Sequence, residues 1–365
     1  MSVFQKLAAI PKVPLFLLCL LAMLGMLMLV SAANGSIYPW AFKQLIRFSF
    51  GFIVMLCVTC IDVRILFLYA YPLYLISFVA LIAVEFMGFV GMGAQRWIDL
   101  YVFNFQPSEM MRLGLILTLA RYFHGLNDDE TINPMSLIIP IVLILAPTLL
   151  VLRQPDLGTA MLLMLSSAAI FFTAGVRLWK FAIVGGAVFT AIPLLWPMLH
   201  EYQKKRIMIF INPESDPTHA GYHIIQSKIA LGSGGIFGKG FLQGTQSHLN
   251  FLPEKQTDFI FTMFCEEFGL IGAVLLILLY MTIIAYNIRI ALNARTPFSR
   301  LAGLGLTVTL FLYVFINMAM VTGLLPVVGI PLPLFSYGGT AMLTLLISQG
   351  ILYSIHIHND TRIRL

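Results

Sequence analysis

Long apolar runs separated by short polar segments make up most of the sequence. Each run is about 20 residues long, which is the length that an α-helix needs to cross the ~30 Å hydrocarbon core of a membrane. The pattern predicts an all-α integral membrane protein with about ten transmembrane helices. We place these helices at about 14–33, 41–61, 66–88, 107–123, 136–152, 158–175, 179–199, 259–286, 301–323 and 336–357.

Two regions depart from this pattern. The longest polar interruption, about 200–258, separates the seventh and eighth predicted helices, and within it HIIQSKIALG (223–232) has the spacing of a short interfacial helix. The second region, LLPVVGIPLPLFSYGG (324–339), is dense in Pro and Gly at membrane depth. Backbone broken in this way is tolerated only where it is buried in protein or lines a wet cavity. Because no repeat of fixed period occurs, we predict one domain over 1–365.

The composition agrees with a membrane protein and excludes an ordinary soluble one. Hydrophobic residues make up 59% of the chain and charged residues only 10%, with a mean hydropathy of +0.92, whereas about 25% of a soluble domain is charged. The net charge of +6 comes from basic residues scattered among short loops, which indicates positive-inside bias rather than nucleic-acid binding. That bias predicts both termini in the cytoplasm and the loop at about 200–258 outside it.

Asp258 stands at the end of the long polar segment, directly before the apolar run FIFTMF. A carboxylate at the mouth of a helix can act as a general base if partial burial keeps its pKa in a workable range. The alternative interpretation is a helix N-cap, because Asp is a favoured cap residue. The two roles are not exclusive, and both stay open on the residues alone.

The run GSGGIFGKG (232–240) resembles a phosphate-binding loop, but it departs from the Walker pattern. Position 233 is Ser where that pattern needs Gly, and Gly240 replaces the Ser or Thr that would hold magnesium. ATP binding is therefore not expected. We interpret the run as a tight turn that lets backbone approach a substrate, with Lys239 as a candidate phosphate contact.

Ionisable residues inside predicted spans are costly and are functional candidates by default. Glu109 and Arg112 are three residues apart on the fourth predicted helix and can pair. Glu266 and Glu267 are adjacent, so they cannot share a helix face, and at least one is expected to find a cation on another helix. A structural ion pair that holds the bundle together is the alternative to a functional role for these residues.

The motifs along the chain resemble those of the SEDS family (shape, elongation, division and sporulation), and specifically its RodA-type, elongation branch. They occur in family order over nearly the whole chain. The residues that carry the resemblance are GAQRWIDL (93–100), FQPSE (105–109), QPDLGTA (154–160), GYHIIQSKIALGSGG (221–235), GKGFLQGTQS (238–247), FLPEKQTDFIF (251–261), EEFGLIG (266–272) and PVVGIPLPLFSYGG (326–339).

The resemblance implies ten transmembrane helices and a peptidoglycan glycosyltransferase that polymerises lipid II at the outer face of the bacterial cytoplasmic membrane during cell elongation. The essential aspartate of the family falls on Asp258, and its acidic–basic pair falls on Glu109 and Arg112. The implied partners are the elongation machinery and a class B penicillin-binding protein, since this chain has no transpeptidase domain. Relatives often have His at the position of Gln256, so a proton relay through that His is not expected.

Combining the residues with the resemblance, we predict Asp258 as the catalytic base, which would deprotonate the C4 hydroxyl of the acceptor sugar as it attacks the donor. Glu266, Glu267 and Asp156 are predicted to have structural or coupling roles. Basic side chains near the outer face suit charge-assisted contacts to the leaving diphosphate, although each taken singly is better explained as an interfacial anchor. The predicted substrate-binding residues are Lys43, Arg47, Arg96, Glu109, Arg112, Arg153, Lys228, Lys239, Lys255 and Ser336.

Cofactors and competing functions stay open. The sequence contains no clear metal cage, but a divalent cation, Mg²⁺ or Mn²⁺, could assist departure of the diphosphate. A flippase for the same polyprenyl-linked sugar is the main alternative function, because ten spans and broken helices also suit a transporter. A polar outer loop that carries the aspartate favours the enzyme, since a carrier would centre its ionisable groups at mid-bilayer. A non-catalytic scaffold would leave Asp258 dispensable.

Overall fold

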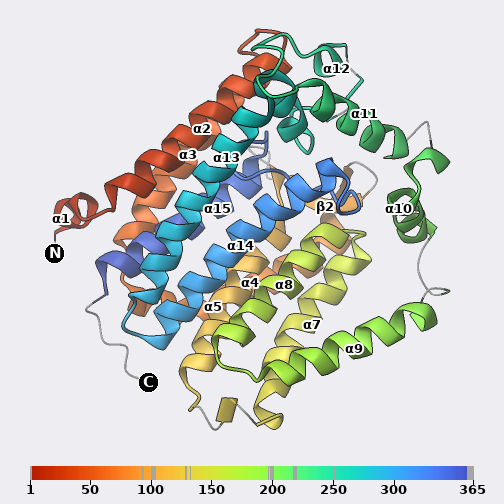
Figure 1. Ribbon diagram of the computed structural model, residues 1–365. Coiled ribbons are helices and arrows are strands. Elements are labelled where there is room, and N and C mark those ends of the chain that lie inside the picture. Colours follow the sequence, from red (N-terminus) through yellow and green to blue (C-terminus); the bar gives the residue numbers. More distant parts are fainter. Residues whose placement is uncertain are drawn as a thin grey trace.

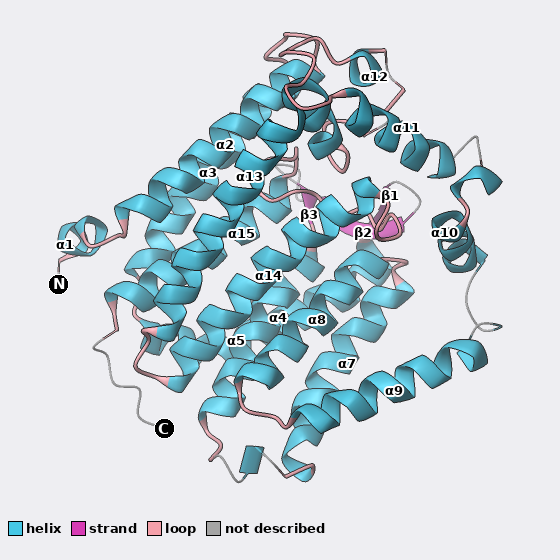
Figure 2. Cartoon of the chain, in the orientation of Figure 1, coloured by secondary structure: helices cyan, strands magenta, loops and turns pink. Residues whose placement is uncertain are grey.

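The computed structural model describes residues 2–91, 94–99, 104–127, 130–131, 133–195, 197, 201–216, 220–249, 251–252 and 254–359. Within these ranges the chain is almost entirely helical (Figure 2), which confirms the predicted all-α fold. Gly93 and Leu100 of the first predicted motif, and Pro253 of the motif around Asp258, lie outside the described residues.

The elements follow one another in a simple order. The helices of the first half are α1 (Val3–Ala8), α2 (Lys12–Ala32), α3 (Trp40–Cys60), α4 (Val63–Met87), α5 (Pro107–His124), the 3-10 helix η1 (Met135–Leu137), α7 (Ile138–Arg153), α8 (Leu157–Thr173) and α9 (Leu178–Leu195). The second half contains α10 (Glu201–Ile211), the 3-10 helix η3 (Pro213–Ser215), α11 (Ala220–Ser233), α12 (Thr245–His248), α13 (Ile260–Leu292), α14 (Pro297–Thr322) and α15 (Gly339–Ile357).

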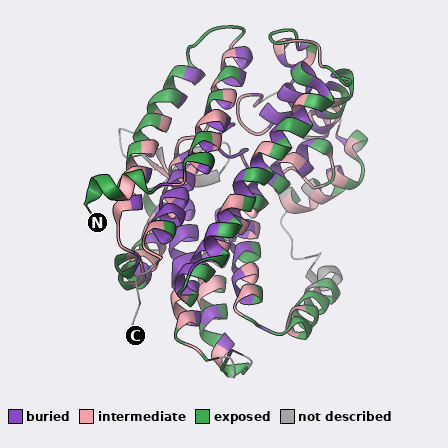
Figure 3. Cartoon of the chain, turned by 60° about the vertical axis from the view of Figure 1, so that its left-hand side comes forward, coloured by how far each residue is buried: buried purple, intermediate pink, exposed green. Residues whose placement is uncertain are grey.

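Helices α14 and α15 form the centre of the bundle. About two thirds of the most apolar window of α14 is buried, against 17% for α4 on the periphery, and Figure 3 shows the buried residues gathered on the inner helices. Helix α14 packs against α13, α8 and α5, and α15 packs against α3. Helix α1 and the last turn of α15 lie at one end of the bundle, and α11, α12 and β2 lie at the other, while α9 runs away from the other helices (Figure 1).

Each of the ten predicted apolar segments contains a helix. Within the described ranges, seven helices are long and apolar enough to cross a membrane by length and composition, so the chain is a multi-pass membrane protein. Helices α8 and α9 are apolar but shorter by this measure, and α5 carries Glu109, Arg112 and Arg121. The count of about ten spans stays a prediction.

The loop between α9 and α13 and the loop between α4 and α5 contain helices and strands of their own. The segment HIIQSKIALG lies in α11, which confirms the predicted short helix. Between α4 and α5 the chain forms a small antiparallel sheet that the sequence did not predict, with strands β1 (Phe89–Gly91), β2 (Ala94–Asp99) and β3 (Asn104–Phe105). Two of these strands have only two or three residues, too few for an alternating pattern to be recognised.

Proline lies inside the apolar helices α4 and α7, and a neighbouring side chain repairs the lost hydrogen bond in each. Pro72 in α4 has no N–H to donate to the carbonyl of Leu68, and the Arg121 guanidinium donates to that oxygen instead, at 2.8 Å. Pro147 leaves the carbonyl of Leu143 in α7 without a partner, and the Tyr74 hydroxyl donates to it at 2.9 Å. Apolar surroundings make such repairs necessary, because an unpaired backbone group there costs several kcal/mol.

Helix α13 is broken at Gly269, whose φ of 66° and ψ of −163° lie in a region that is essentially restricted to glycine. The break removes the helical bonds from the N–H groups of residues 270 and 271 to the carbonyls of 266 and 267. All four groups are paired again by the loop after α11. Glu266 and Glu267 accept from the backbone N–H groups of Lys239 and Gly240, and Leu270 and Ile271 donate to the carbonyls of residues 235 and 236.

The glycine-rich run at 232–240 therefore approaches the backbone of α13, and its approach to a substrate stays a prediction. A Cβ on Gly238 would lie 2.1 Å from the carbonyl oxygen of Glu267, and one on Gly234 would lie 2.2 Å from that of Cys265. Glycine is needed at both positions because backbone meets backbone there. We call residues 235–240 the splint, since this segment replaces the broken hydrogen bonds of α13.

We expect Gly238→Ala to destabilise the protein by about 3 kcal/mol or more, because it combines a left-handed φ of 81° with the clash against Glu267. The measurement is the thermal unfolding midpoint in detergent. Gly186→Ala is the control, since a Cβ at Gly186 on α9 meets nothing within 4 Å and should leave the midpoint unchanged or higher. Equal midpoints for the two variants would contradict the splint.

Candidate active site

Asp258 lies in a tight turn, 254–259, that leads into α13. The turn closes through a hydrogen bond from the Thr257 N–H to the carbonyl of Glu254, at 3.0 Å. The Thr257 hydroxyl and the Gln256 amide both donate to the Glu254 carboxylate. The turn therefore organises its own polar groups and presents Asp258 at its end.

The Asp258 carboxylate is partly buried and forms no salt bridge among the residues that the structure describes. One of its oxygens, Oδ2, lies 3.5 Å from the position that a Cβ on Gly329 would take. Burial, with a smaller contribution from the nearby Glu254 carboxylate, raises the pKa of Asp258 to about 6. A carboxylate with this pKa is ionised at neutral pH and accepts a proton more readily than an exposed one, as a general base must.

The N-cap interpretation of Asp258 is wrong. The N-cap position of α13 is Phe259, and no side chain caps the helix there. The start of α13 is instead held through its backbone and through the burial of Phe259 and Ile260. The carboxylate of Asp258 is thus left available for another role.

The Pro- and Gly-rich segment 326–338 packs against this turn, and its residues 332–336 are buried while Gly329 is exposed. Its composition predicted backbone that is buried in protein or lines a wet cavity. Its carbonyls receive donors from three helices: Gln44 of α3 donates to Ser336, Tyr280 of α13 to Pro333, and Asn317 of α14 to Ile330. Ser336 has its hydroxyl fully engaged, because it donates to the carbonyl of Thr257 and accepts from the N–H of Leu332.

Glu109 and Arg112 form a buried ion pair with a 2.7 Å contact between Oε2 and Nη2, as their spacing predicted. The hydroxyls of Tyr313 on α14 and Thr344 on α15 both donate to Glu109, and the guanidinium of Arg112 lies over the Tyr313 ring. The pair thereby connects α5, α14 and α15. Arg112 and Tyr313 also border a cavity of about 10 Å³ beside segment 326–338, which is room for about one water molecule.

Arg96 and Asp156 act together at the turn between α7 and α8. Asp156 is the N-cap of α8, where its side chain accepts from the N–H and the hydroxyl of Thr159. Arg96 on β2 donates to the carbonyls of Gln154 and Pro155 and lies 3.8 Å from the Asp156 carboxylate. The predicted structural role of Asp156 fits this geometry, and Arg96 fastens the small sheet to the bundle.

Glu266 and Glu267 point in different directions from α13. Glu266 is fully buried and accepts from Lys239, at 2.8 Å, and from the N–H groups of Gln246 and Ser247 in α12. Its cation lies in the splint and not on another helix, whereas we expected at least one of the two glutamates to find a cation on another helix. Glu267 contacts the Ser31 hydroxyl of α2 and, at 3.2 Å, the imidazole of His248 in α12.

Lys255 continues this chain of contacts toward the candidate base. It is buried, and its ammonium group donates to the carbonyl of Ser247 at 2.8 Å. Burial lowers the pKa of Lys255. Because Ser247 is itself held by Glu266, the turn that carries Asp258 is connected through α12 to the broken part of α13.

Several of the predicted basic residues form no salt bridge among the described parts of the chain, among them Lys43, Arg47, Arg153 and Lys228. Arg47 is the one that the structure connects to Asp258, since its guanidinium lies 4.6 Å from the centre of the Tyr337 ring and the Tyr337 N–H donates to the carbonyl of Gln256. Lys43 is exposed on α3, and Lys228 is exposed on α11, where it lies beside Gly323.

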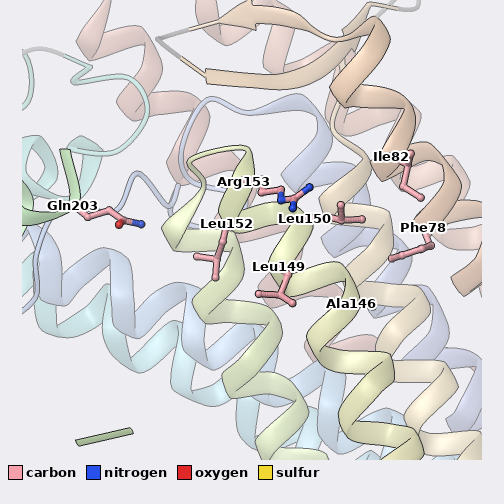
Figure 4. A pocket seen from close by; sticks show the side chains of 8 residues that line it. All are labelled: Phe78, Ile82, Ala146, Leu149, Leu150, Leu152, Arg153 and Gln203. Atoms are coloured by element: carbon pink, nitrogen blue, oxygen red, sulfur yellow. The ribbon is translucent and has the colours of Figure 1, made fainter. Parts of the chain in front are cut away.

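Arg153, the last residue of α7, borders a cavity of about 540 Å³ between α4, α7 and α10. Its other walls are mainly apolar, among them Phe78, Ile82 and Leu149 (Figure 4). A cation at the end of an apolar hollow suits an amphiphile with an anionic head group.

Sequence reasoning missed Asn317 and Gly329, although both lie against Asp258. Asn317 is fully buried and donates to the carbonyls of Asp258 and Ile330. A lone Asn in the apolar run of α14 was the signal that could have indicated it. Over the described ranges, no group of three or more His, Cys, Asp and Glu side chains could hold a metal ion.

Comparison with known proteins agrees with this arrangement. The model of the FtsW, RodA and SpoVE family, described as "Cell cycle protein", matches residues 11–361. The chain belongs to this family. It is 47% identical over 352 residues to "Peptidoglycan glycosyltransferase MrdB" of Escherichia coli (strain K12), covering 94% of this chain and 93% of the relative.

Solved structures give the same result for this FtsW/RodA/SpoVE-family protein. One match is a chain from "Structural coordination of polymerization and crosslinking by a peptidoglycan synthase complex", with a TM-score of 0.83, 29% identity, and coverage of 96% of this chain and 98% of the other. Another is the rod shape determining protein RodA of Thermus thermophilus, with a TM-score of 0.72, 28% identity, and coverage of 95% and 96%. The predicted family and the predicted enzyme class, peptidoglycan glycosyltransferase, are therefore confirmed.

The raised pKa of Asp258 in this family member has a consequence for stability. The folded-state pKa of about 6 lies above the ordinary value of 3.8, so ionisation destabilises the folded state above pH 6, and the effect vanishes below about pH 4. We expect Asp258→Asn to raise the free energy of unfolding by roughly 1–2 kcal/mol at pH 7, and by much less at pH 4.5. Thermal unfolding in detergent at the two pH values measures this difference.

The matched control is Asp62→Asn at the N-cap of α4. Asn caps a helix about as well as Asp, so this variant should change little at either pH. A loss of stability in Asp258→Asn at pH 7 would show that the Asp258 carboxylate stabilises the fold instead.

Proposed function

We propose that this protein polymerises lipid II into glycan strands at the outer face of the bacterial cytoplasmic membrane during cell elongation and shape maintenance, with Asp258 as the general base. One observation carries the assignment of the base. Asp258 is a partly buried carboxylate with no salt bridge among the described residues, held in a fixed turn beside Gly329. Its pKa of about 6 suits proton transfer near neutral pH.

The proposed reaction is a single displacement. Asp258 accepts the proton of the C4 hydroxyl on the acceptor N-acetylglucosamine as that oxygen forms a bond to C1 of the donor N-acetylmuramic acid. The bond between C1 and the diphosphate oxygen breaks, and undecaprenyl diphosphate leaves with both electrons. One displacement inverts the α-linked donor to a β-1,4 product. A positioned base supplies ~10²–10⁴-fold of rate.

The rest of the acceleration comes from holding two lipid-anchored sugars together and from stabilising the departing diphosphate. Of the predicted contacts, Arg47 and Arg153 best suit the diphosphate. Arg47 is half-buried next to the segment that holds Asp258, and Arg153 stands at the end of an apolar hollow. Arg112 and Lys239 are neutralised by Glu109 and Glu266, so we assign them to holding the site in shape. Any Mg²⁺ or Mn²⁺ would come with the diphosphate.

The proposed topology puts both termini in the cytoplasm and Asp258 outside. Lys6 near the N-terminus contacts the end of α3, and Asn359 near the C-terminus contacts the loop before α14, at one end of the bundle. The contact between Asn34 and His248 lies at the other end, with α12. Basic loops favour the cytoplasmic side, so the chemistry takes place where lipid-linked precursors and growing wall meet.

We also propose that a class B penicillin-binding protein crosslinks the product as a bound partner. An apolar groove of about 700 Å³ runs between α11, α13 and α14, with Phe261, Phe311 and Phe315 in its walls. A groove of this kind suits a single membrane helix, which packs by shape rather than by a hydrophobic driving force inside a bilayer.

The proposal predicts that the purified protein, with its partner if needed, converts lipid II into glycan chains in detergent, and that Asp258→Ala makes none. The expected loss is at least ~10²-fold, because the base is removed. Gel analysis of labelled glycan chains measures it. Chains from neither protein, together with lipid II exchange between leaflets in liposomes, would identify a flippase. Normal polymerisation by Asp258→Ala would contradict the assigned base.

The pH dependence provides a separate test. A general base works only when deprotonated, so activity should be full above about pH 7 and fall as the pH drops through about 6. The drop in kcat/KM should approach tenfold for each pH unit below that value. A carboxylate with an ordinary pKa would keep its activity to about pH 4, so a flat profile down to pH 5 would exclude a base with a pKa of about 6.

A further inference from the structure

The turn that carries Asp258 is fastened at three consecutive carbonyl groups. The carbonyl of Gln256 accepts from the Tyr337 N–H at 2.8 Å, and that of Thr257 accepts from the Ser336 hydroxyl at 2.6 Å. The carbonyl of Asp258 itself accepts from the side-chain amide of Asn317 at 3.0 Å. All three donors come from α14 or from the segment between α14 and α15, so one rigid unit holds the whole turn.

Asn317 has a particular place in this arrangement. Its amide nitrogen has two hydrogens at a fixed angle, and the second donates to the carbonyl of Ile330 at 2.7 Å. Ile330 follows Gly329, whose backbone lies against the Asp258 carboxylate. The fully buried Asn317 amide therefore sets the distance between the backbone of Asp258 and the backbone at Gly329, which the Asp258 carboxylate faces.

Ser336 completes the connection from the other side. Its hydroxyl accepts from the Leu332 N–H at 2.8 Å while donating to Thr257, so it cannot rotate away without leaving a buried group unpaired. Its own carbonyl is held by Gln44 of α3 at 2.9 Å. Ser336 therefore connects the turn to α3 of the bundle.

The carboxylate of Asp258 forms no hydrogen bond or salt bridge within the described part of the chain that would orient it directly. Its direction is therefore set by its backbone. We infer that Asn317 and Ser336 are positioning residues for the proposed base: they aim Asp258 by clamping the carbonyls of residues 257 and 258. This inference rests on the proposed function of Asp258, and it assigns neither residue a contact with substrate.

The first test is Asn317→Leu, a substitution of similar size that removes both donors. We expect kcat for glycan formation from lipid II to fall by about 10²-fold, because a displacement of about 1 Å in a reacting group costs that much. KM should stay within about twofold, since the sugar contacts are untouched. The acid limb of the pH profile, meaning the fall in activity at low pH, should move from about pH 6 toward pH 4, because the freed Asp258 carboxylate becomes solvated.

Asn287→Leu is the matched control. Asn287 is also fully buried, on α13, and neither atom of its amide group has a partner among the described residues. Removing an unpaired buried amide is neutral or stabilising, so this variant should keep kcat within twofold and keep the acid limb unchanged. The comparison separates loss of a buried Asn in general from loss of the clamp.

Ser336→Ala is the second test, and it is used if Asn317→Leu does not fold. It removes one hydroxyl without adding bulk, and we expect a fall in kcat of about tenfold with the same direction of shift in the acid limb. If both residues act on one turn, the double variant should lose less than the product of the two single losses. Ser336→Thr retains the hydroxyl and should recover at least half of the wild-type kcat.

These experiments distinguish failure of the proposed function from failure of the positioning role. If the wild type makes no glycan, or Asp258→Asn is as active as the wild type, the proposed function fails. If the wild type is active and Asp258→Asn is not, but Asn317→Leu and Ser336→Ala keep both kcat and the acid limb, only the positioning role fails. A fall in kcat with no movement of the acid limb would also overturn it, because it indicates a structural loss alone.

Discussion

The fold depends on one constraint, which is that a backbone polar group away from water must find a partner inside the protein. The bundle breaks its helices repeatedly, at Pro72, at Pro147, at Gly269 and through segment 326–338, and each break leaves carbonyls or N–H groups without a helical bond. In every case a side chain or a loop from elsewhere replaces the lost bond. These replacements tie distant parts of the sequence together more specifically than apolar packing does.

The same constraint explains why a partly buried carboxylate with no ion-pair partner among the described residues can stand at the mouth of the bundle. Asp258 raises the free energy of the folded state at neutral pH, and a loose turn would relax to let it reach water. The clamp on residues 256–258 prevents that relaxation. Stability is therefore lost at the base and recovered in the hydrogen bonds around it, an exchange often seen at functional sites.

Much of this arrangement could be predicted from the sequence, and the remainder could not for physical reasons. Helix positions follow from apolar length because the bilayer sets that length, and Asp258 and the Glu109–Arg112 pair follow from charge placement and family motifs. The glycine-rich run showed that backbone approaches something closely, but not that the object is α13. Asn317 was hidden because a single polar residue in an apolar helix does not reveal which distant carbonyls it meets.

The break at Gly269 divides α13 into two helical halves, 260–268 and 270–292. The splint bonds to both halves, at residues 266 and 267 of the first and at residues 270 and 271 of the second, and the second half is also held near its middle, where Tyr280 contacts Pro333. Asp258 lies two residues before the first half. The first half of α13 and the turn before it are thereby held to the second half through residues 235–240.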